Sequence, residues 1–187
     1  SNIYAVSSRG GSVKQITHGE HQIFDYSYSP ATNRFALAIS DALIPDDLYT
    51  ARANDRRLAR LTRINADAFA NLQLSKPQRF VVPRDDGWSV EGWLMKPIGW
   101  KRGHKYPAVL EIHGGPHAAY GVTFFHEFQL LCANGYAVIF TNPRGSAGYG
   151  QDFVKATYHD WGGGDCRDLM AAMDYALQVW DADGDGV

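Results

Sequence analysis

The sequence predicts an α/β protein, with a doubly wound, mostly parallel sheet in residues 73–187 and an all-β segment in residues 1–72 before it. Short β-type runs repeat in the first segment. In the second segment the pattern is strand, helix, strand, and a glycine-rich loop directly follows two of the predicted strands. Strands that alternate with helices are typical of a parallel sheet with helices on its faces.

Composition limits the classes of partner. The chain has 187 residues, is 45% hydrophobic and carries a formal net charge of -2, which suits a core for one or two domains. This charge provides no attraction to nucleic acid or to an anionic membrane. No apolar run approaches the roughly 20 residues that span a bilayer. We therefore expect neither nucleic-acid nor membrane partners.

The all-β segment contains two copies of one pattern, offset by 45 residues, a period that suits a four-stranded β-propeller blade. The copies are Ile3-Tyr4, Val13 and Ile16-Thr17, then Leu48-Tyr49, Leu58 and Leu61-Thr62. Between them, Pro30–Asn33 separates two β-type runs and predicts a hairpin. A blade buries its faces only against neighbouring blades, so we expect residues 1–72 to be the C-terminal part of a propeller. Another β-meander is the alternative.

The second segment begins with a hairpin signal, Asp86-Gly87, between apolar runs. Residues 108–112 form a short apolar run of the kind found in sheets covered on both faces. A helix is expected over residues 123–133, closed by Asn134-Gly135, with a strand over 136–141 after it. This succession predicts a parallel crossover.

The clearest helix follows Gly162–Gly164, with Asp165 as the expected N-cap. Its apolar residues recur at helical spacing and predict the buried face. They are Cys166, Leu169, Met170, Met173, Leu177 and Trp180.

Two loops carry the chemical signal. His113-Gly114-Gly115-Pro116 follows a predicted strand, and its glycines let the backbone turn an amide N–H toward an oxygen that becomes negative during acyl transfer. The alternative is that Gly-Gly-Pro only forms a turn. The second loop, Asn142–Gly150, also follows a strand and is glycine-rich.

The blade repeat, Val90–Trp93, Tyr106-Pro107 and the two loops, in this order, resemble the prolyl oligopeptidase family of serine peptidases, and its acylaminoacyl-peptidase and dipeptidyl-peptidase branch in particular. The resemblance covers essentially the whole chain. It implies a β-propeller stacked on an α/β-hydrolase domain, with short peptides as substrates and no cofactor. On this interpretation the chain is a fragment: the last blade or blades of the propeller, then a partial α/β-hydrolase domain.

The resemblance also implies roles for residues. Gly115 would donate its backbone N–H to the oxyanion hole, and His113 would shape the loop. We assign His113, Gly114, Arg144 and Tyr149 to the substrate site. For Arg144, pairing with a carboxylate to hold its loop is an equal alternative.

The nucleophile is expected outside the chain, because no Gly-x-Ser-x-Gly sequence occurs in it. In the family, the serine elbow would follow soon after Val187, and the acid and the histidine later, so the chain alone should be inactive. Ser146, in Gly145-Ser146-Ala147-Gly148, is a near match and the alternative nucleophile. It is a poor one, because Gly148 and Gly150 disfavour the helix that an elbow opens into.

No metal is expected. Asp181–Gly186 matches the first half of a calcium loop but lacks its glutamate, and His113 and His117 share a Gly-Pro loop rather than a helical face. Cys132 and Cys166 fall on separate predicted helices and are expected to be buried free thiols. These two cysteines do not indicate a cellular compartment. We expect the cytoplasm, while the periplasm, secretion and homo-oligomers stay open.

Three functions remain. The first is a serine peptidase that hydrolyses short peptides through an acyl-enzyme. The second is a noncatalytic propeller and hydrolase-like module that binds peptides. The third is a carboxylesterase that uses the same oxyanion loop.

Overall fold

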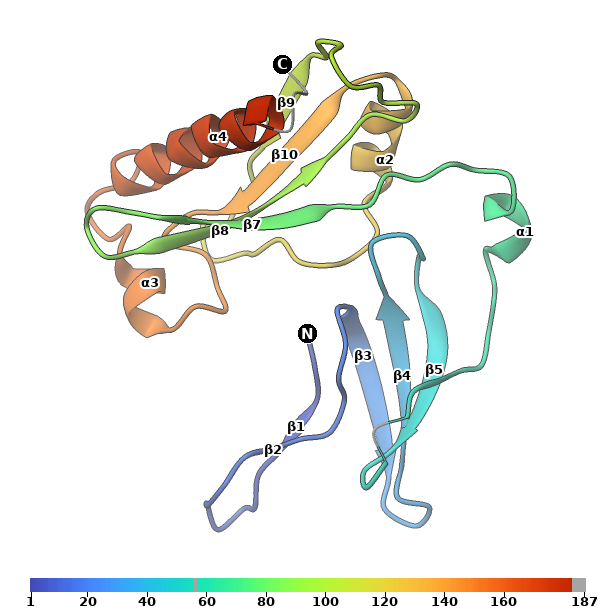
Figure 1. The fold of residues 1–187 in the computed structure, drawn as a ribbon. Coiled ribbons are helices and arrows are strands. Elements are labelled where there is room, and N and C mark those ends of the chain that lie inside the picture. The colour runs from blue at the N-terminus through green and yellow to red at the C-terminus, as the bar shows by residue number, and fades with distance from the viewer. Residues whose placement is uncertain (56, 183–187) are drawn as a thin grey trace. The chain divides into compact units, whose positions relative to one another are not determined.

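The computed structural model describes residues 1–55 and 57–182. The chain forms two compact units, Ser1–Leu72 with Gly121–Phe125, and Gln73–Tyr120 with His126–Val187 (Figure 1). Most of the calcium-like segment Asp181–Gly186, and Val187 after it, lie outside the described residues. None of the helices in the described ranges is both long and apolar enough to cross a membrane.

The first unit is built from antiparallel strands. Strands β3 (Gln22–Ser29), β4 (Arg34–Ser40), β5 (Asp47–Arg52) and β6 (Ala59–Arg60) form one sheet in chain order, and β1 (Tyr4–Ala5) pairs with β2 (Lys14–Gln15). The hairpin expected around Pro30–Asn33 joins β3 to β4 and is confirmed. A short helix, α1 (Ala66–Phe69), follows.

The 45-residue repeat is also a repeat of hydrogen bonds. The Ile3 amide donates to Thr17 Oγ1 at 2.8 Å, and the Leu48 amide donates to Thr62 Oγ1 at 2.9 Å. The Ile3 carbonyl accepts from the Ile16 amide at 2.8 Å, and the Leu48 carbonyl accepts from the Leu61 amide at 2.7 Å. The pair β1–β2 therefore has the same register as the pair β5–β6.

The core of the first unit comes from alternate residues of β4. Phe35, Leu37 and Ile39 point to one side of the sheet and pack with Ile16 and Ala51. This is the period of two that a strand with one buried face requires.

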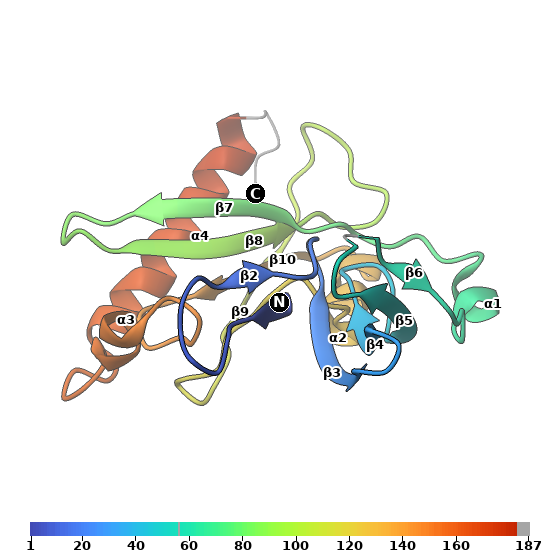
Figure 2. The same ribbon diagram turned by 90° about the horizontal axis from the view of Figure 1, so that it is seen from below.

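The second unit contains a sheet covered by helices. Its strands are β7 (Gln78–Pro83), β8 (Ser89–Met95), β9 (Ala108–Glu111) and β10 (Ala137–Asn142), in the order β7-β8-β10-β9. Its helices are α2 (His126–Ala133), α3 (Gln151–Lys155) and α4 (Gly164–Ala182). Figure 2 shows β7 and β8 side by side, with α4 crossing behind them.

The expectation of a mostly parallel sheet is wrong for the described residues. Only β9 and β10 are parallel, while β7–β8 and β8–β10 are antiparallel. The α2 crossover forces the parallel pair, whereas the tight turn at Asp86-Gly87 returns the chain as an antiparallel hairpin. The sheet is therefore mixed.

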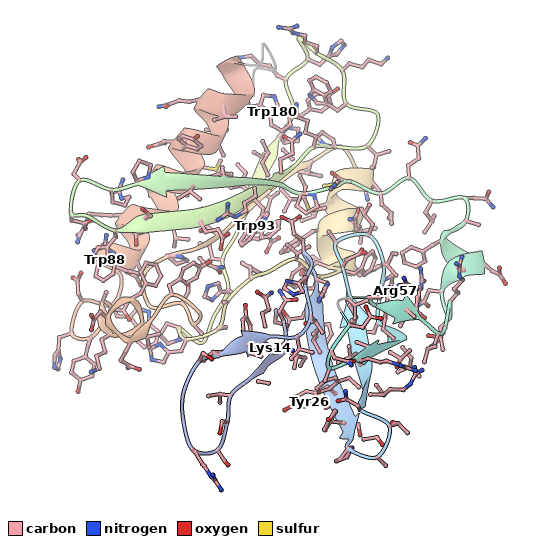
Figure 3. The ribbon with its side chains drawn as sticks, turned by 60° about the horizontal axis from the view of Figure 1, so that its bottom comes forward. Lys14, Tyr26, Arg57, Trp88, Trp93 and Trp180 are labelled. Carbon is pink, nitrogen blue, oxygen red and sulfur yellow. The ribbon has the colours of Figure 1, made fainter. Side chains whose placement is uncertain are left out.

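The two long helices cover opposite faces of the sheet. Phe140 packs on Phe128 of α2, with ring centroids 4.9 Å apart, while Ile139 packs with Ala176 and Trp180 of α4. Adjacent residues of a strand point to opposite faces. Every residue of β10 is buried, which explains why its sequence is apolar almost throughout. Figure 3 labels Trp93 and Trp180. Trp93, on β8, stacks on Phe140.

The face that α4 buries matches the expected one in part: Trp180 is buried and Met173 and Leu177 pack against the core as expected, whereas Cys166 and Met170 are exposed. Asp168, Ala172, Ala176 and Trp180 are each at most 1% exposed, whereas Met170 is 52% exposed. The pattern of large apolar residues does not indicate Asp168, Ala172 and Ala176, because this part of the face consists of a carboxylate and two small side chains. The helix also begins one residue before the expected cap, and the Gly164 amide donates to Asp160 Oδ2 at 2.8 Å.

Two smaller expectations need correction. Helix α2 begins at His126 rather than at residue 123, because residues 121–125 belong to the first unit, where the Phe124 amide donates to Ser40 Oγ at 3.0 Å. Of the two cysteines, Cys132 is buried and Cys166 is exposed, and both are free. Burial raises the pKa of the Cys132 thiol to about 11, so this thiol stays protonated at neutral pH.

Asp47 ties β5 to the segment after β6. Its carboxylate is inaccessible to solvent and accepts from Thr62 Oγ1 at 2.6 Å, the Ile64 amide at 3.1 Å and Arg60 Nε at 3.1 Å. Burial alone would raise its pKa, but these bonds outweigh burial and the pKa is lowered. The carboxylate therefore stabilises the fold at neutral pH, and this stability is lost as the pH falls through the lowered pKa.

We predict that Asp47→Asn lowers the free energy of unfolding at pH 7 by about 2–3 kcal/mol, the value of hydrogen bonds to a charged group. Asparagine fits the geometry, since Asn2 occupies the matching place in the first copy and accepts from Thr17 Oγ1 at 3.1 Å. Urea denaturation at pH 7 and pH 3 measures the effect, which should shrink at the lower pH. The neighbouring exposed Asp46→Asn is the control, and equal unfolding midpoints for the two variants would contradict the prediction.

Candidate active site

The loop after β9 presents a free amide. Gly115 has φ +126°, and an added Cβ would lie 2.9 Å from the Ala118 amide nitrogen, so only glycine fits without strain. Gly115 is exposed, and its N–H donates to no group within residues 1–55 and 57–182. Because β9 and β10 are parallel, the loops after them meet at one edge of the sheet.

The loop after β10 holds the loop after β9 at consecutive residues. Hydrogen bonds join His113 Nε2 to Ser146 Oγ at 2.9 Å, His117 Nδ1 to the Gly145 carbonyl at 2.9 Å, and the Ala147 amide to the Ala118 carbonyl at 3.0 Å. These bonds flank Gly115 on both sides. The position of the Gly115 amide is therefore set by the second loop.

Asn142, at the end of β10, provides a further link. Its buried side chain accepts from the Tyr120 amide at 2.8 Å and donates to the Tyr120 carbonyl at 2.9 Å. Burial, with the charges of Glu111 and Glu127 adding to it, raises the pKa of the Tyr120 hydroxyl to about 12. This role of Asn142 was not predicted from the sequence, although a polar residue at the end of a buried strand is a usable signal.

Ser146 does not have the geometry of a nucleophile. The residue is fully buried, and its hydroxyl donates to the Pro143 carbonyl at 2.6 Å. The single hydroxyl proton cannot be donated to both the Pro143 carbonyl and His113 Nε2, so the bond to Pro143 competes with proton transfer to the histidine. Both side chains serve to join the loops.

Arg144 forms the carboxylate pair that the sequence left as one of two alternatives. Its guanidinium donates to both oxygens of Asp168 at 2.8 Å and to Asp86 at 2.7 Å. The bonds to Asp168, followed by those to Asp86, raise the pKa of Arg144 despite burial. The side chain is 8% exposed.

Tyr149 is similarly engaged. Its hydroxyl donates to Glu91 and accepts from the Asn142 side-chain amide at 2.7 Å. Burial, with Glu91 adding to it, raises the pKa of this hydroxyl. Its role in substrate binding stays a prediction.

A small hollow brings most of the predicted site together. His113, Gly114, Gly115 and Arg144 line a cavity of about 120 Å³, and Tyr149 lies outside its lining. A larger hollow of about 600 Å³ borders the same loop at Pro116. Among the described side chains, no three His, Cys, Asp or Glu residues gather as metal ligands would.

Comparison with known proteins identifies relatives of this fold and these loops. Residues 122–186 match the model of the prolyl oligopeptidase family. The chain is 40% identical over 176 residues to YuxL, an uncharacterised peptidase of Bacillus subtilis. This match covers 94% of this chain and 26% of that protein. It is 28% identical over 189 residues to dipeptidyl-peptidase 5 of Porphyromonas gingivalis, covering 100% of this chain and 27% of that protein.

The chain is also similar to solved structures of peptidases. The acylaminoacyl peptidase of Pyrococcus horikoshii superposes with a TM-score of 0.83 and 31% identity, over 95% of this chain and 27% of that one. An acylaminoacyl peptidase in complex with Z-Gly-Gly-Phe-chloromethyl ketone gives a TM-score of 0.84 at the same identity and coverage. These matches place residues 122–186 in the prolyl oligopeptidase family, and the chain is similar to peptidases of this kind over almost its whole length. It spans about a quarter of the length of these relatives.

We predict that Asn142→Ala lowers the free energy of unfolding by about 2–4 kcal/mol, because it removes two hydrogen bonds to the Tyr120 backbone and leaves their partners unsatisfied. Asn134→Ala is the matched control, since the exposed Asn134 side chain bonds to the Leu130 carbonyl of the helix that it follows directly. Chemical denaturation of both variants measures their free energies of unfolding. A loss below 1 kcal/mol for Asn142→Ala would show that the link is dispensable.

Proposed function

We propose that the whole protein is a serine peptidase that hydrolyses short peptides through an acyl-enzyme. The observation that carries this proposal is the free amide of Gly115, held at the carboxyl edge of β9 by bonds on both sides. An amide fixed in this way is suited to an oxygen that becomes negative. Such a donor contributes about 2.7–4 kcal/mol to transition-state stabilisation in hydrolases.

The chain would supply one part of the machinery. When a serine attacks a peptide carbonyl, the carbonyl oxygen takes the negative charge, and the Gly115 N–H would donate to it. The second donor, the nucleophile, the acid and the histidine would come from outside residues 1–187. The fourfold greater length of the relatives supports this division.

The class of substrate is argued from the relatives. One is a dipeptidyl-peptidase, and one acylaminoacyl peptidase binds a peptidyl chloromethyl ketone. We infer that short peptides, with a free or an acylated amino end, are the substrates. Nothing in the two loops favours a carboxylesterase, and a peptide-binding module without catalysis is the outcome if no serine reacts.

We also propose that the first unit belongs to a β-propeller. Two features support this: the identical hydrogen bonds of the two copies, and the exposed aromatic residues of the edge strand β3, Phe24, Tyr26 and Tyr28. An adjacent blade would cover these rings, as blades do in closed propellers. The propeller would restrict entry to short peptides.

A fluorophosphonate probe tests the nucleophile. We expect the full-length protein to be labelled at one serine within a Gly-x-Ser-x-Gly sequence outside residues 1–187, and to cleave peptide amides as well as p-nitrophenyl esters. The fragment 1–187 alone should stay unlabelled, and Ser146→Ala in the full-length protein should label as the parent does, because the Ser146 hydroxyl is buried. Mass spectrometry locates the label. A label on Ser146, or no label and no peptide turnover, would refute the proposal.

A second test addresses the oxyanion donor. We expect Gly115→Ala to lower kcat/KM by about 10²–10³-fold, because the added Cβ moves the amide that stabilises the oxyanion. Gly103→Ala is the control: its φ of +78° gives comparable backbone strain, but its added Cβ meets nothing within 4 Å and it lies outside the site. If Gly115→Ala and Gly103→Ala had equal kcat/KM, Gly115 would not be the oxyanion donor.

A further inference from the structure

We propose that Asp168 is a positioning residue for the oxyanion donor, acting through Arg144. This inference rests on the proposed function. Asp168, a buried carboxylate of α4, would control the position of the Gly115 amide without contacting it directly.

Asp168 fixes both the side chain and the backbone of Arg144. Its Oδ2 accepts from the Arg144 amide at 3.0 Å and from Arg144 Nε at 2.8 Å, and its Oδ1 accepts from Arg144 Nη2 at 2.8 Å. Asp168 is 0% exposed, so these donors have no competition from water. One carboxylate therefore determines where the loop after β10 leaves the strand.

The next three residues carry this position to the oxyanion loop. Gly145, Ser146 and Ala147 follow Arg144 directly, and each bonds one residue of the segment 113–118. Gly115 lies two residues from each of the two bonded histidines. A shift of Arg144 would therefore be passed to the Gly115 amide through three parallel hydrogen bonds rather than through one flexible contact.

The surroundings leave Arg144 little freedom to shift while Asp168 is intact. Gly164, at the start of α4, lets the stem of Arg144 lie against the helix, since an added Cβ there would meet Arg144 Cδ at 2.6 Å. Arg144 Nη2, which donates to Asp168, also donates to Asp86 Oδ2 at 2.7 Å, and Arg84 Nε lies 3.4 Å from Asp168 Oδ1. The two arginines balance the two carboxylates, so the cluster has no net charge.

The position matters because oxyanion donors act over a narrow range. A donor is effective at about 2.7–3.1 Å from the developing oxyanion. A misplacement of about 1 Å can cost on the order of 10²-fold in rate. Substrate binding, by contrast, would not depend on this one amide.

The variant Asp168→Asn in the full-length protein tests the proposal. We expect kcat to fall about 10–100-fold while KM changes less than about threefold, because the transition state depends on the displaced amide and substrate binding does not. Affinity for a peptide boronic acid, which forms a tetrahedral adduct, should fall by a similar factor. Gly164→Ala, which presses on Arg144 without removing a charge, should give a smaller loss of the same kind.

Trp180→Phe is the matched control, because Trp180 lies on the same buried face of α4 but packs with Leu94 and Ile139. It should lower stability and leave kcat unchanged. The proposal is overturned if Asp168→Asn and Gly164→Ala lose stability but keep the parent kcat and boronate affinity.

Amide hydrogen exchange separates this inference from the proposed function. Asp168→Asn should speed exchange of the Ala147 and Tyr120 amides, which bond across and beside the two loops, and Trp180→Phe should not. If the parent protein cleaves no peptide, the proposed function fails while this measurement still reports on the coupling. Unchanged exchange in Asp168→Asn would refute the coupling itself.

Discussion

The buried pair of Asp168 and Arg144 is the interaction on which the second unit depends. It joins α4 to the end of β10 and, through Asp86, to the β7–β8 hairpin. A buried ion pair is costly to form, and removing one partner leaves an uncompensated charge. Such a pair is therefore weak evidence for stability alone. Its value here lies in geometry, because two charges with several directional bonds allow one arrangement of three elements.

The same principle organises the site outward from this pair. Asp168 and Arg144 hold the start of the second loop, the second loop holds the first, and the first presents a free amide at Gly115. The hydrogen bonds of the first two steps are buried or partly buried, where an unsatisfied group would be expensive. The proposed chemistry would use this N–H as one of two fixed donors, and side chains that would not touch the reacting atoms hold it in place.

Local signals were enough to predict much of the fold from the sequence. The 45-residue repeat appears as repeated hydrogen bonds, Asp86-Gly87 forms its hairpin, and both loops follow strands. The errors concern contacts between distant residues. Strand direction across β8 and β10 depends on how a hairpin docks, and the burial of Asp168 on α4 depends on the charges of Arg144 and Arg84. Likewise, glycines after strands indicate the loops, but nothing local pairs His113 with Ser146.

The central claim is that the amide of Gly115 stabilises an oxyanion. A crystal structure of the full-length protein with a peptide boronic acid bound tests it most directly. The account predicts a tetrahedral boron with one oxygen at about 2.7–3.1 Å from the Gly115 nitrogen. A boronate bound to the catalytic serine with no oxygen within hydrogen-bond distance of that nitrogen would contradict it.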